Sequence, residues 1–129
     1  MFNRPPTHEN PDSPRFNQAI ADFTHAHELQ PANIVHLANR GVAYAWKNDA
    51  VHAEQDFAAV RKNDPSNLVL LHGEGLLALS RGDMADAVRL FSDAIARDSS
   101  DAWAFRMRAK AYRRLDEQEK MRADAAAAL

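Results

Sequence analysis

The feature that most constrains this sequence is an internal period of 34 residues. Gly41 recurs as Gly75, and Asn33 recurs as Asn67 and then as Asp101. The same interval separates an alanine column, a phenylalanine column and a pair of prolines: Ala19, Ala53 and Ala87; Phe23, Phe57 and Phe91; Pro31 and Pro65. A fixed period of this size is typical of stacked copies of one supersecondary unit, so we expect a repeat array.

Each period carries two helical patterns joined by a short turn. A side chain able to accept from the free N–H groups of a first helical turn precedes each pattern, as at an N-cap. These residues are Asn33, Asn67 and Asp101 before the first helices, and Asp49, Asp83 and Asp116 or Glu117 before the second helices. Pro65 stops the helix that precedes it. The patterns predict seven helices, near residues 15–30, 34–47, 50–63, 68–81, 84–97, 102–115 and 118–129.

These columns resemble the tetratricopeptide repeat, a 34-residue helix–turn–helix unit with a W-x2-L-G-x2-Y…A-x3-F…P pattern. Gly41 and Tyr44 supply G-x2-Y, and the alanine and phenylalanine columns supply A-x3-F. The NRG-x-AY wording at residues 39–44 is similar to a common bacterial form of the repeat. The departures from the pattern are Leu37, Leu71 and Phe105 for Trp, Ser99 for Pro, and Ala109, Met121 and Ala125 in the last copy.

The resemblance implies an all-α fold, a right-handed α-solenoid of antiparallel helix pairs with about 3.5 repeats. The expected domain organisation is a disordered or extended segment at residues 1–14, rich in proline, and a repeat domain at residues 15–129. That domain divides into a half repeat, 15–33, and repeats 34–67, 68–101 and 102–129. Within it, Gly41 and Gly75 are expected to let a neighbouring helix approach closely, with Tyr44 and Phe57 filling the adjacent space.

Composition excludes several classes of protein. A net charge of −2 gives no support for nucleic-acid binding. The absence of cysteine excludes disulfides, thiolate metal sites and a cysteine nucleophile. No apolar run approaches the roughly 18 residues of a membrane span, and the first residues lack the apolar core of a signal peptide. We therefore expect a soluble, cytoplasmic protein with no membrane partner.

The sequence offers little chemistry. His25 and His27 fall on different helix faces, and the remaining histidines show no HExxH-type spacing, so no metal site is expected. No nucleophile–base constellation or phosphate-binding loop is present, so we expect neither catalysis nor a cofactor. Arg40 and Asp56, spaced 16 residues apart like Arg108 and Asp124, are interpreted as an ion pair between packed helices.

The resemblance implies that the first helix of each pair lines a concave groove. On that assignment the lining changes from apolar to basic along the array, because residues 102–129 carry seven Lys or Arg against four Asp or Glu. Arg106, Lys110 and Arg113 share one helical face and could hold an acidic side chain or a chain-terminal carboxylate. The alternative is a solvated charged face. The predicted peptide-binding residues are Asn39, Trp46, His72, Trp103, Arg106, Lys110 and Arg113.

The expected function is non-catalytic binding of a protein or peptide, as a scaffold or adaptor. The alternative is self-association into a homo-oligomer, because the expected array lacks a first helix at one end and finishes with the apolar AAAAL at the other. A third interpretation is that the chain is a fragment of a larger tetratricopeptide protein.

Overall fold

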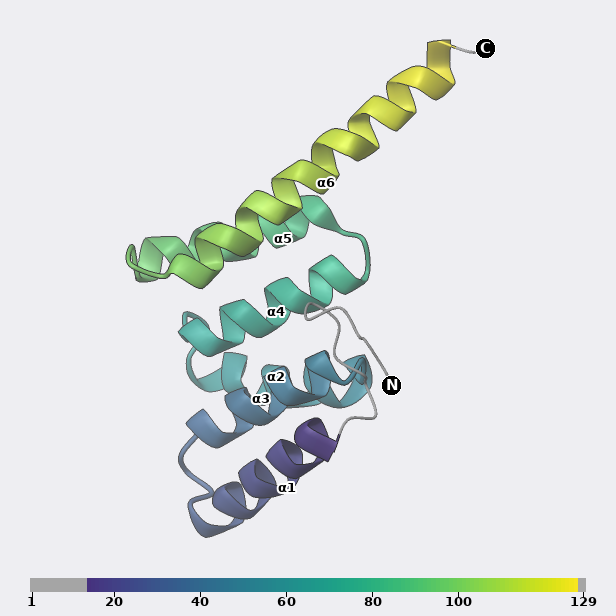
Figure 1. Ribbon diagram of the computed structural model, residues 1–129. Coiled ribbons are helices and arrows are strands. Elements are labelled where there is room, and N and C mark those ends of the chain that lie inside the picture. The colour runs from purple at the N-terminus through teal and green to yellow at the C-terminus, as the bar shows by residue number, and fades with distance from the viewer. Residues whose placement is uncertain (1–13, 128–129) are drawn as a thin grey trace. The chain divides into compact units, whose positions relative to one another are not determined.

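The computed structural model describes residues 14–127, and throughout this range the only regular secondary structure is helical (Figure 1). The expected all-α class is therefore confirmed for the described residues. The helices are α1 (Pro14–Leu29), α2 (Val35–Trp46), α3 (Ala50–Asn63), α4 (Leu68–Ser80), α5 (Met84–Arg97) and α6 (Ala102–Ala127).

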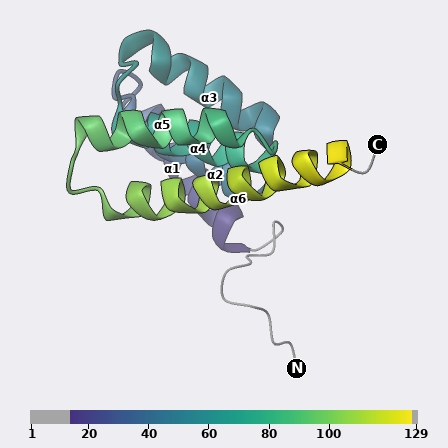
Figure 2. The ribbon, with the colours of Figure 1, turned by 90° about the horizontal axis from the view of Figure 1, so that it is seen from above.

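The chain divides into two compact units, Met1–Gly73 and Glu74–Leu129, with the boundary inside the sequence of α4. In the first unit, α2 packs against both α1 and α3. In the second unit, α5 and α6 pack side by side. Figure 2 shows that the C-terminal part of α6 extends well beyond α5, on the side where α5 begins. The candidate residues are accordingly described unit by unit.

Polar side chains start most of the helices, as their sequence positions predict. Asn67 and Asp101 accept from the backbone N–H groups of Leu70 and Ala104, each at 3.0 Å. Asp49 and Asp83 do the same for the second helices of their pairs. The exception is Asn33, because α2 starts one residue later than the repeat predicts. The N-cap position of α2 is Ile34, and Asn33 instead accepts from the Val35 N–H at 3.0 Å.

Asp49 illustrates what such a cap contributes. Its carboxylate accepts from the His52 backbone N–H at 3.2 Å and contacts the His52 ring Nδ1 at 2.7 Å. Burial alone would raise the pKa of Asp49, but the bonds from the His52 backbone and ring lower it below its ordinary value of 3.8. The ionised cap therefore stabilises the fold above pH 3.8, and this contribution disappears as the pH falls through the lowered pKa.

We expect Asp49→Ala to lower the free energy of unfolding by about 1 kcal/mol at neutral pH. The difference from the original protein should shrink in acid, since the protonated carboxyl is a weaker acceptor. Asp49→Asn is the control, because it keeps an acceptor oxygen but cannot titrate. Urea unfolding at neutral and acidic pH measures all three proteins. An equal loss for both variants at both pH values would contradict this account of the cap.

The two turns between paired helices each contain one residue with a left-handed backbone. These residues are Asn48, with φ of 66°, and Gly82, with φ of 77°. Glycine adopts this conformation without strain, and asparagine tolerates it better than most residues. Each of them ends its helix and lets the chain turn back along the first helix of the pair.

The prediction of seven helices is wrong, because the last two are one continuous helix of 26 residues, α6. The position equivalent to Asn48 and Gly82 is Asp116, and aspartate adopts a left-handed backbone only occasionally, whereas glycine adopts it routinely. Good helix formers surround it, and Lys120 forms an ion pair with Asp116 one turn away at 3.1 Å. The helix consequently runs straight through the expected turn, and up to Ala127 the last repeat forms no second antiparallel helix.

The repeated spacing of glycine and phenylalanine corresponds to close packing in the core of each unit. Phe57 is fully buried, and a Cβ added at Gly41 would lie 2.5 Å from its ring. An added Cβ at Gly73 would also clash with that ring. In the second unit, a Cβ at Gly75 would lie 2.5 Å from the ring of Phe91. The expectation that Gly41 and Gly75 permit close approach is confirmed, and Gly73 extends it.

The expected N-terminal segment, residues 1–14, lies outside the described residues except for Pro14, which is the first residue of α1. The last two residues of the AAAAL sequence also lie outside them. Among residues 14–127, no helix combines the length and the apolar character that crossing a bilayer requires.

Candidate functional site

The basic side of α6 is the clearest candidate for a binding site. Arg106, Lys110 and Arg113 are all exposed, and their spacing places them on one side of the helix. None of the three forms a hydrogen bond or ion pair with another residue in the described part of the chain. Their charges are therefore available to an external anion, and arginine can hold a carboxylate through two parallel hydrogen bonds.

Trp103 lies near the start of the same helix but is only half-exposed. Its ring packs edge-to-face against Phe91 of α5, with the ring centroids 5.7 Å apart and the planes at 79°. This arrangement is the favoured one for an aromatic pair and contributes to the packing of α5 against α6. The sequence could not distinguish this contact from an exposed binding anchor, because both require a large aromatic residue.

The remaining three predicted residues belong to the first unit. Trp46, the last residue of α2, is 43% exposed and offers an apolar surface. Asn39 and His72 are half-buried on α2 and α4. Trp46 is the one of these three whose exposure suits an interaction hot spot, since aromatic side chains dominate such sites.

The predicted pair of Arg40 and Asp56 is present and is more extensive than the sequence indicates. Arg40 donates from Nε and Nη2 to the two carboxylate oxygens of Asp56, at 2.8 and 2.7 Å. Its Nη1 donates to the hydroxyl of Thr24 on α1 at 3.2 Å. The hydrogen bond to Asp56 raises the pKa of Arg40 above its ordinary value, against the opposing effect of burial. One guanidinium thus joins α1, α2 and α3.

The same polar arrangement begins again two periods later, in the second unit. Arg108 donates from Nη1 to the hydroxyl of Ser92 at 3.1 Å, as Arg40 does to Thr24. The predicted partner, Asp124, has a side chain outside the described residues, so that pair stays a prediction. The hydroxyls of Thr24 and Ser92 share one repeat position. That shared position was the signal from which both contacts could have been predicted.

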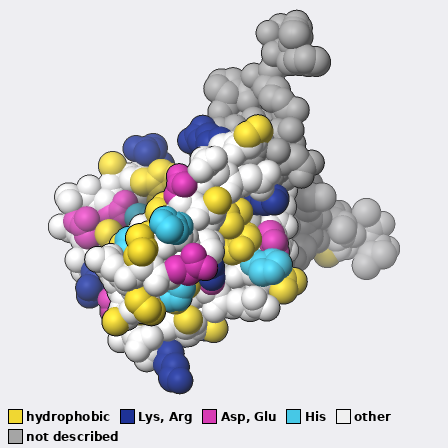
Figure 3. Space-filling view, turned by 90° about the horizontal axis from the view of Figure 1, so that it is seen from below, with side chains coloured by type: hydrophobic (Ala, Val, Ile, Leu, Met, Phe, Trp, Pro, Cys, Tyr) yellow, Lys and Arg dark blue, Asp and Glu magenta, His cyan; other side chains and the backbone are white. Residues whose placement is uncertain are grey.

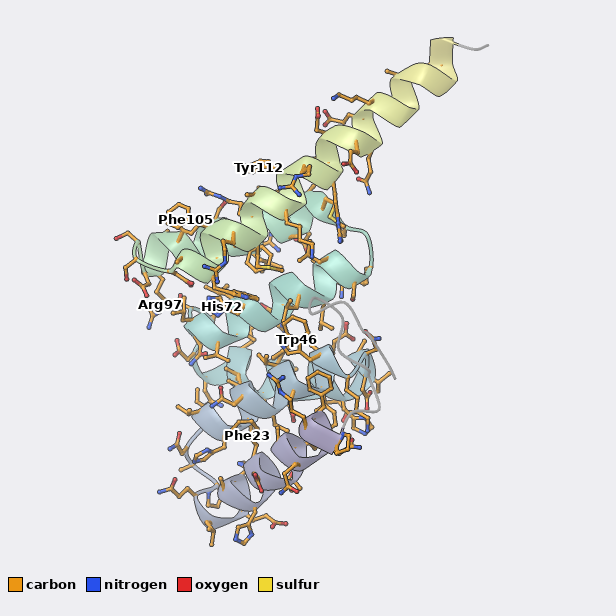
Figure 4. All side chains as sticks on the ribbon, viewed as in Figure 1. Phe23, Trp46, His72, Arg97, Phe105 and Tyr112 are labelled. Atoms are coloured by element: carbon orange, nitrogen blue, oxygen red, sulfur yellow. The ribbon has the colours of Figure 1, made fainter. Side chains whose placement is uncertain are left out.

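Aromatic side chains flank Arg108 on a second exposed side of α6. The Arg108 guanidinium carbon lies 5.4 Å from the ring centre of Phe105 and 6.0 Å from that of Tyr112, within the range of cation–π attraction. Figure 4 shows both rings on the same side of the helix. Phe105 is 42% exposed and Tyr112 is 51% exposed. Sequence reasoning missed this surface, because it assumed that a following helix covers it.

Two of the described histidines, His36 and His52, have local structural partners. Figure 3 shows histidine side chains interspersed with acidic and hydrophobic ones on one face of the molecule. His52 contacts Asp49 and stacks on Tyr44 with ring centroids 5.0 Å apart, and His36 contacts Gln30 at 3.0 Å. Among the described residues, no three His, Asp or Glu side chains are placed to hold a metal ion.

The helix pairs and the glycine–phenylalanine packing agree with one comparison to known proteins. The chain is 31% identical over 102 residues to the human protein named Tetratricopeptide repeat protein 13. The repeats of this chain are therefore similar to tetratricopeptide repeats. The alignment takes in 77% of this chain but only 11% of the human protein, so the chain spans a small part of its curated relative. No protein-family model matches the chain.

Proposed function

We propose that this chain is a non-catalytic protein-binding module of the tetratricopeptide family, with the repeats at 15–33, 34–67, 68–101 and 102–129 stacked as a right-handed solenoid. Two observations support a binding role. The chain is similar to a tetratricopeptide repeat protein, and helix-pair repeat arrays present extended surfaces to their partners. A bacterial source, a cytoplasmic location and a place within a longer repeat protein belong to the same proposal.

The exposed basic side of α6 is the main support for this proposal. Arg106, Lys110 and Arg113 present three positive charges that no described side chain neutralises. The ligand chemistry that fits them is an acidic side chain or a free C-terminal carboxylate of a peptide. We propose Asn39, Trp46 and His72 of the first unit and Trp103 of the second as further contact residues of the concave surface.

A charge-reversal experiment tests this site. A peptide with acidic residues and a free C-terminus is titrated into the protein, beside its amidated form, and fluorescence anisotropy reports binding. Changing Arg106, Lys110 and Arg113 to Glu should weaken binding by at least about tenfold, because attraction becomes repulsion. Added salt should weaken binding to the original protein, since exposed charges are screened.

The matched control reverses three exposed charges outside α6, at Lys62, Arg81 and Arg97. It changes the net charge by the same amount and leaves the proposed site intact. Equal binding by the two triple variants would show that net charge alone attracts the peptide. Failure of the original protein to bind any acidic peptide would overturn the proposed ligand chemistry.

Self-association is a second candidate function, favoured by a specific observation. Phe105 and Tyr112 are large apolar side chains exposed on one side of α6. Exposed apolar surface of this kind marks interaction sites in many proteins.

A further inference from the structure

The first unit shows what normally covers the side of a helix that Phe105 and Tyr112 occupy. On α2, the equivalent residues are Leu37 and Tyr44, which are half-buried, with the buried Gly41 between them. Helix α3 covers this side, where Phe57 packs on Gly41 and His52 stacks on Tyr44. The Arg40–Asp56 pair lies at the same interface. The contacts between α2 and α3 thus define both a docking surface and the helix that fits it.

Helix α6 presents the same docking surface, and no helix within residues 14–127 covers it. Phe105, Ala109 and Tyr112 are all exposed, whereas their counterparts on α2 are buried or half-buried. Arg108 contacts the hydroxyl of Ser92 and the ring of Tyr112. These contacts match those of Arg40 with Thr24 and Tyr44. What the described residues do not supply to Arg108 is the carboxylate and the helix that carries it. We define Phe105, Arg108, Ala109 and Tyr112 as the open face.

Residues 118–127 correspond in sequence to the helix that would cover the open face. In this structure they lie beyond the open face along α6 and cannot cover it in their own chain. The repeat period aligns residues 118–127 with the start of α3, so that Asp124 corresponds to Asp56 and Ala125 to Phe57. Those residues instead continue α6 as one helix. At about 1.5 Å per residue, Asp124 lies roughly 24 Å along the helix from Arg108.

We propose that a second copy of this chain covers the open face, and that residues 118–127 of each α6 dock on the open face of the other copy. When two antiparallel α6 helices are related by a two-fold axis near Asp116, each helix covers the open face of the other, as in a domain-swapped dimer. Arg108 of each copy then pairs with Asp124 of the other. Ala109 of each copy packs against Ala125 of the other, as Gly41 packs against Phe57.

Charge favours this antiparallel arrangement. Residues 105–114 contain five basic and no acidic residues, whereas residues 115–124 contain four acidic and two basic residues. Antiparallel pairing places the basic half of each helix against the acidic half of the other, whereas parallel pairing would place like charges together. The proposal deepens the self-association candidate, and the contacts that it specifies, Arg108 with Asp124 and Ala109 with Ala125, do not include Arg106, Lys110 or Arg113 of the acidic-peptide site.

Mass measurement across a wide range of protein concentration, by light scattering or sedimentation, gives the first test. The original protein should pass from monomer to dimer. Arg108→Glu and Asp124→Arg should each raise the dissociation constant by about tenfold or more, because two-fold symmetry removes both pairs at once. Mixed in equal amounts, the two variants should form a heterodimer, since each copy then meets an opposite charge at both positions.

Arg114→Glu is the control, because it makes the same charge change away from the open face and should leave the dimer intact. Circular dichroism confirms that each variant keeps its helices. A strictly monomeric original protein would overturn the proposal, and so would a dimer that Arg108→Glu leaves unchanged. Neither result would affect the acidic-peptide site, which the titration of that peptide tests separately.

A cross-link locates the contact directly. The chain has no cysteine, so Ala109→Cys and Ala125→Cys each introduce a single thiol. Mixing the two variants under mild oxidation should give a disulfide-linked heterodimer in high yield, because the two positions face each other between copies. Placing the thiol of one variant at Ala123 instead of Ala125 should lower the yield. Equal yields at both positions would contradict the proposed register.

Discussion

Phe57→Ala is expected to lower the free energy of unfolding by about 3–5 kcal/mol. The Phe57 ring is fully buried, and it packs against the backbone at both Gly41 and Gly73. Removing it leaves a cavity that two helices already in close contact cannot easily collapse to fill. Urea unfolding followed by circular dichroism measures the loss.

A second substitution separates packing from a general loss of hydrophobicity. Gly41→Ala should destabilise the original protein, because its Cβ would lie 2.5 Å from the Phe57 ring. In the Phe57→Ala background the same change should be neutral or stabilising, since the added methyl group enters the vacated space and alanine favours the helix. Equal effects of Gly41→Ala in both backgrounds would contradict the described packing.

Asp56→Ala should have the next largest effect, about 3 kcal/mol. Asp56 has a side chain only 6% exposed and holds two nitrogen atoms of Arg40. Its removal leaves that guanidinium largely buried without a carboxylate. The loss should be at the low end for a broken buried pair, because Arg40 keeps 20% exposure and its bond to Thr24. Thermal and urea unfolding report the change.

Two controls make this second prediction specific. Asp93→Ala removes the partner of an exposed pair with Arg89, at 3.7 Å, and should cost no more than about 0.5 kcal/mol. Adding Arg40→Met to Asp56→Ala should recover much of the loss, since no unpaired charge then remains buried. If Asp56→Ala cost no more than Asp93→Ala, the Arg40 network would not be a stabilising contact.

The sequence predicts the helices well where the periodic pattern and the turn residues agree. The bounds expected for α3 and α5 match the structure, because Asp49 and Asp83 begin these helices and left-handed residues precede them. The prediction failed in the last copy, where the apolar pattern continues but the turn residue is Asp116. Hydrophobic spacing shows which side of a helix is buried, and it does not show whether the chain reverses between helices.

The candidate site is predicted less completely than the fold. Residue type and helical spacing place Arg106, Lys110 and Arg113 on one side of α6, and the structure shows them exposed. The contact of Trp103 with Phe91 could not be predicted, because it depends on how α5 and α6 pack. The exposure of Phe105 and Tyr112 was missed for a related reason. Their exposure arises because residues 118–127 continue α6 and do not fold back over it, whereas the residue types themselves are those of a covered surface.

The double contact of Phe57 has a consequence for how the first unit unfolds. One ring touches the first helix of its own pair at Gly41 and the first helix of the next pair at Gly73, so opening either helix removes support from the other. Amide hydrogens of α2 and of the neighbouring part of α4 should therefore exchange with solvent in one cooperative event. In Phe57→Ala the two segments should exchange at separate rates. A single side chain would then set the extent of cooperativity between successive repeats.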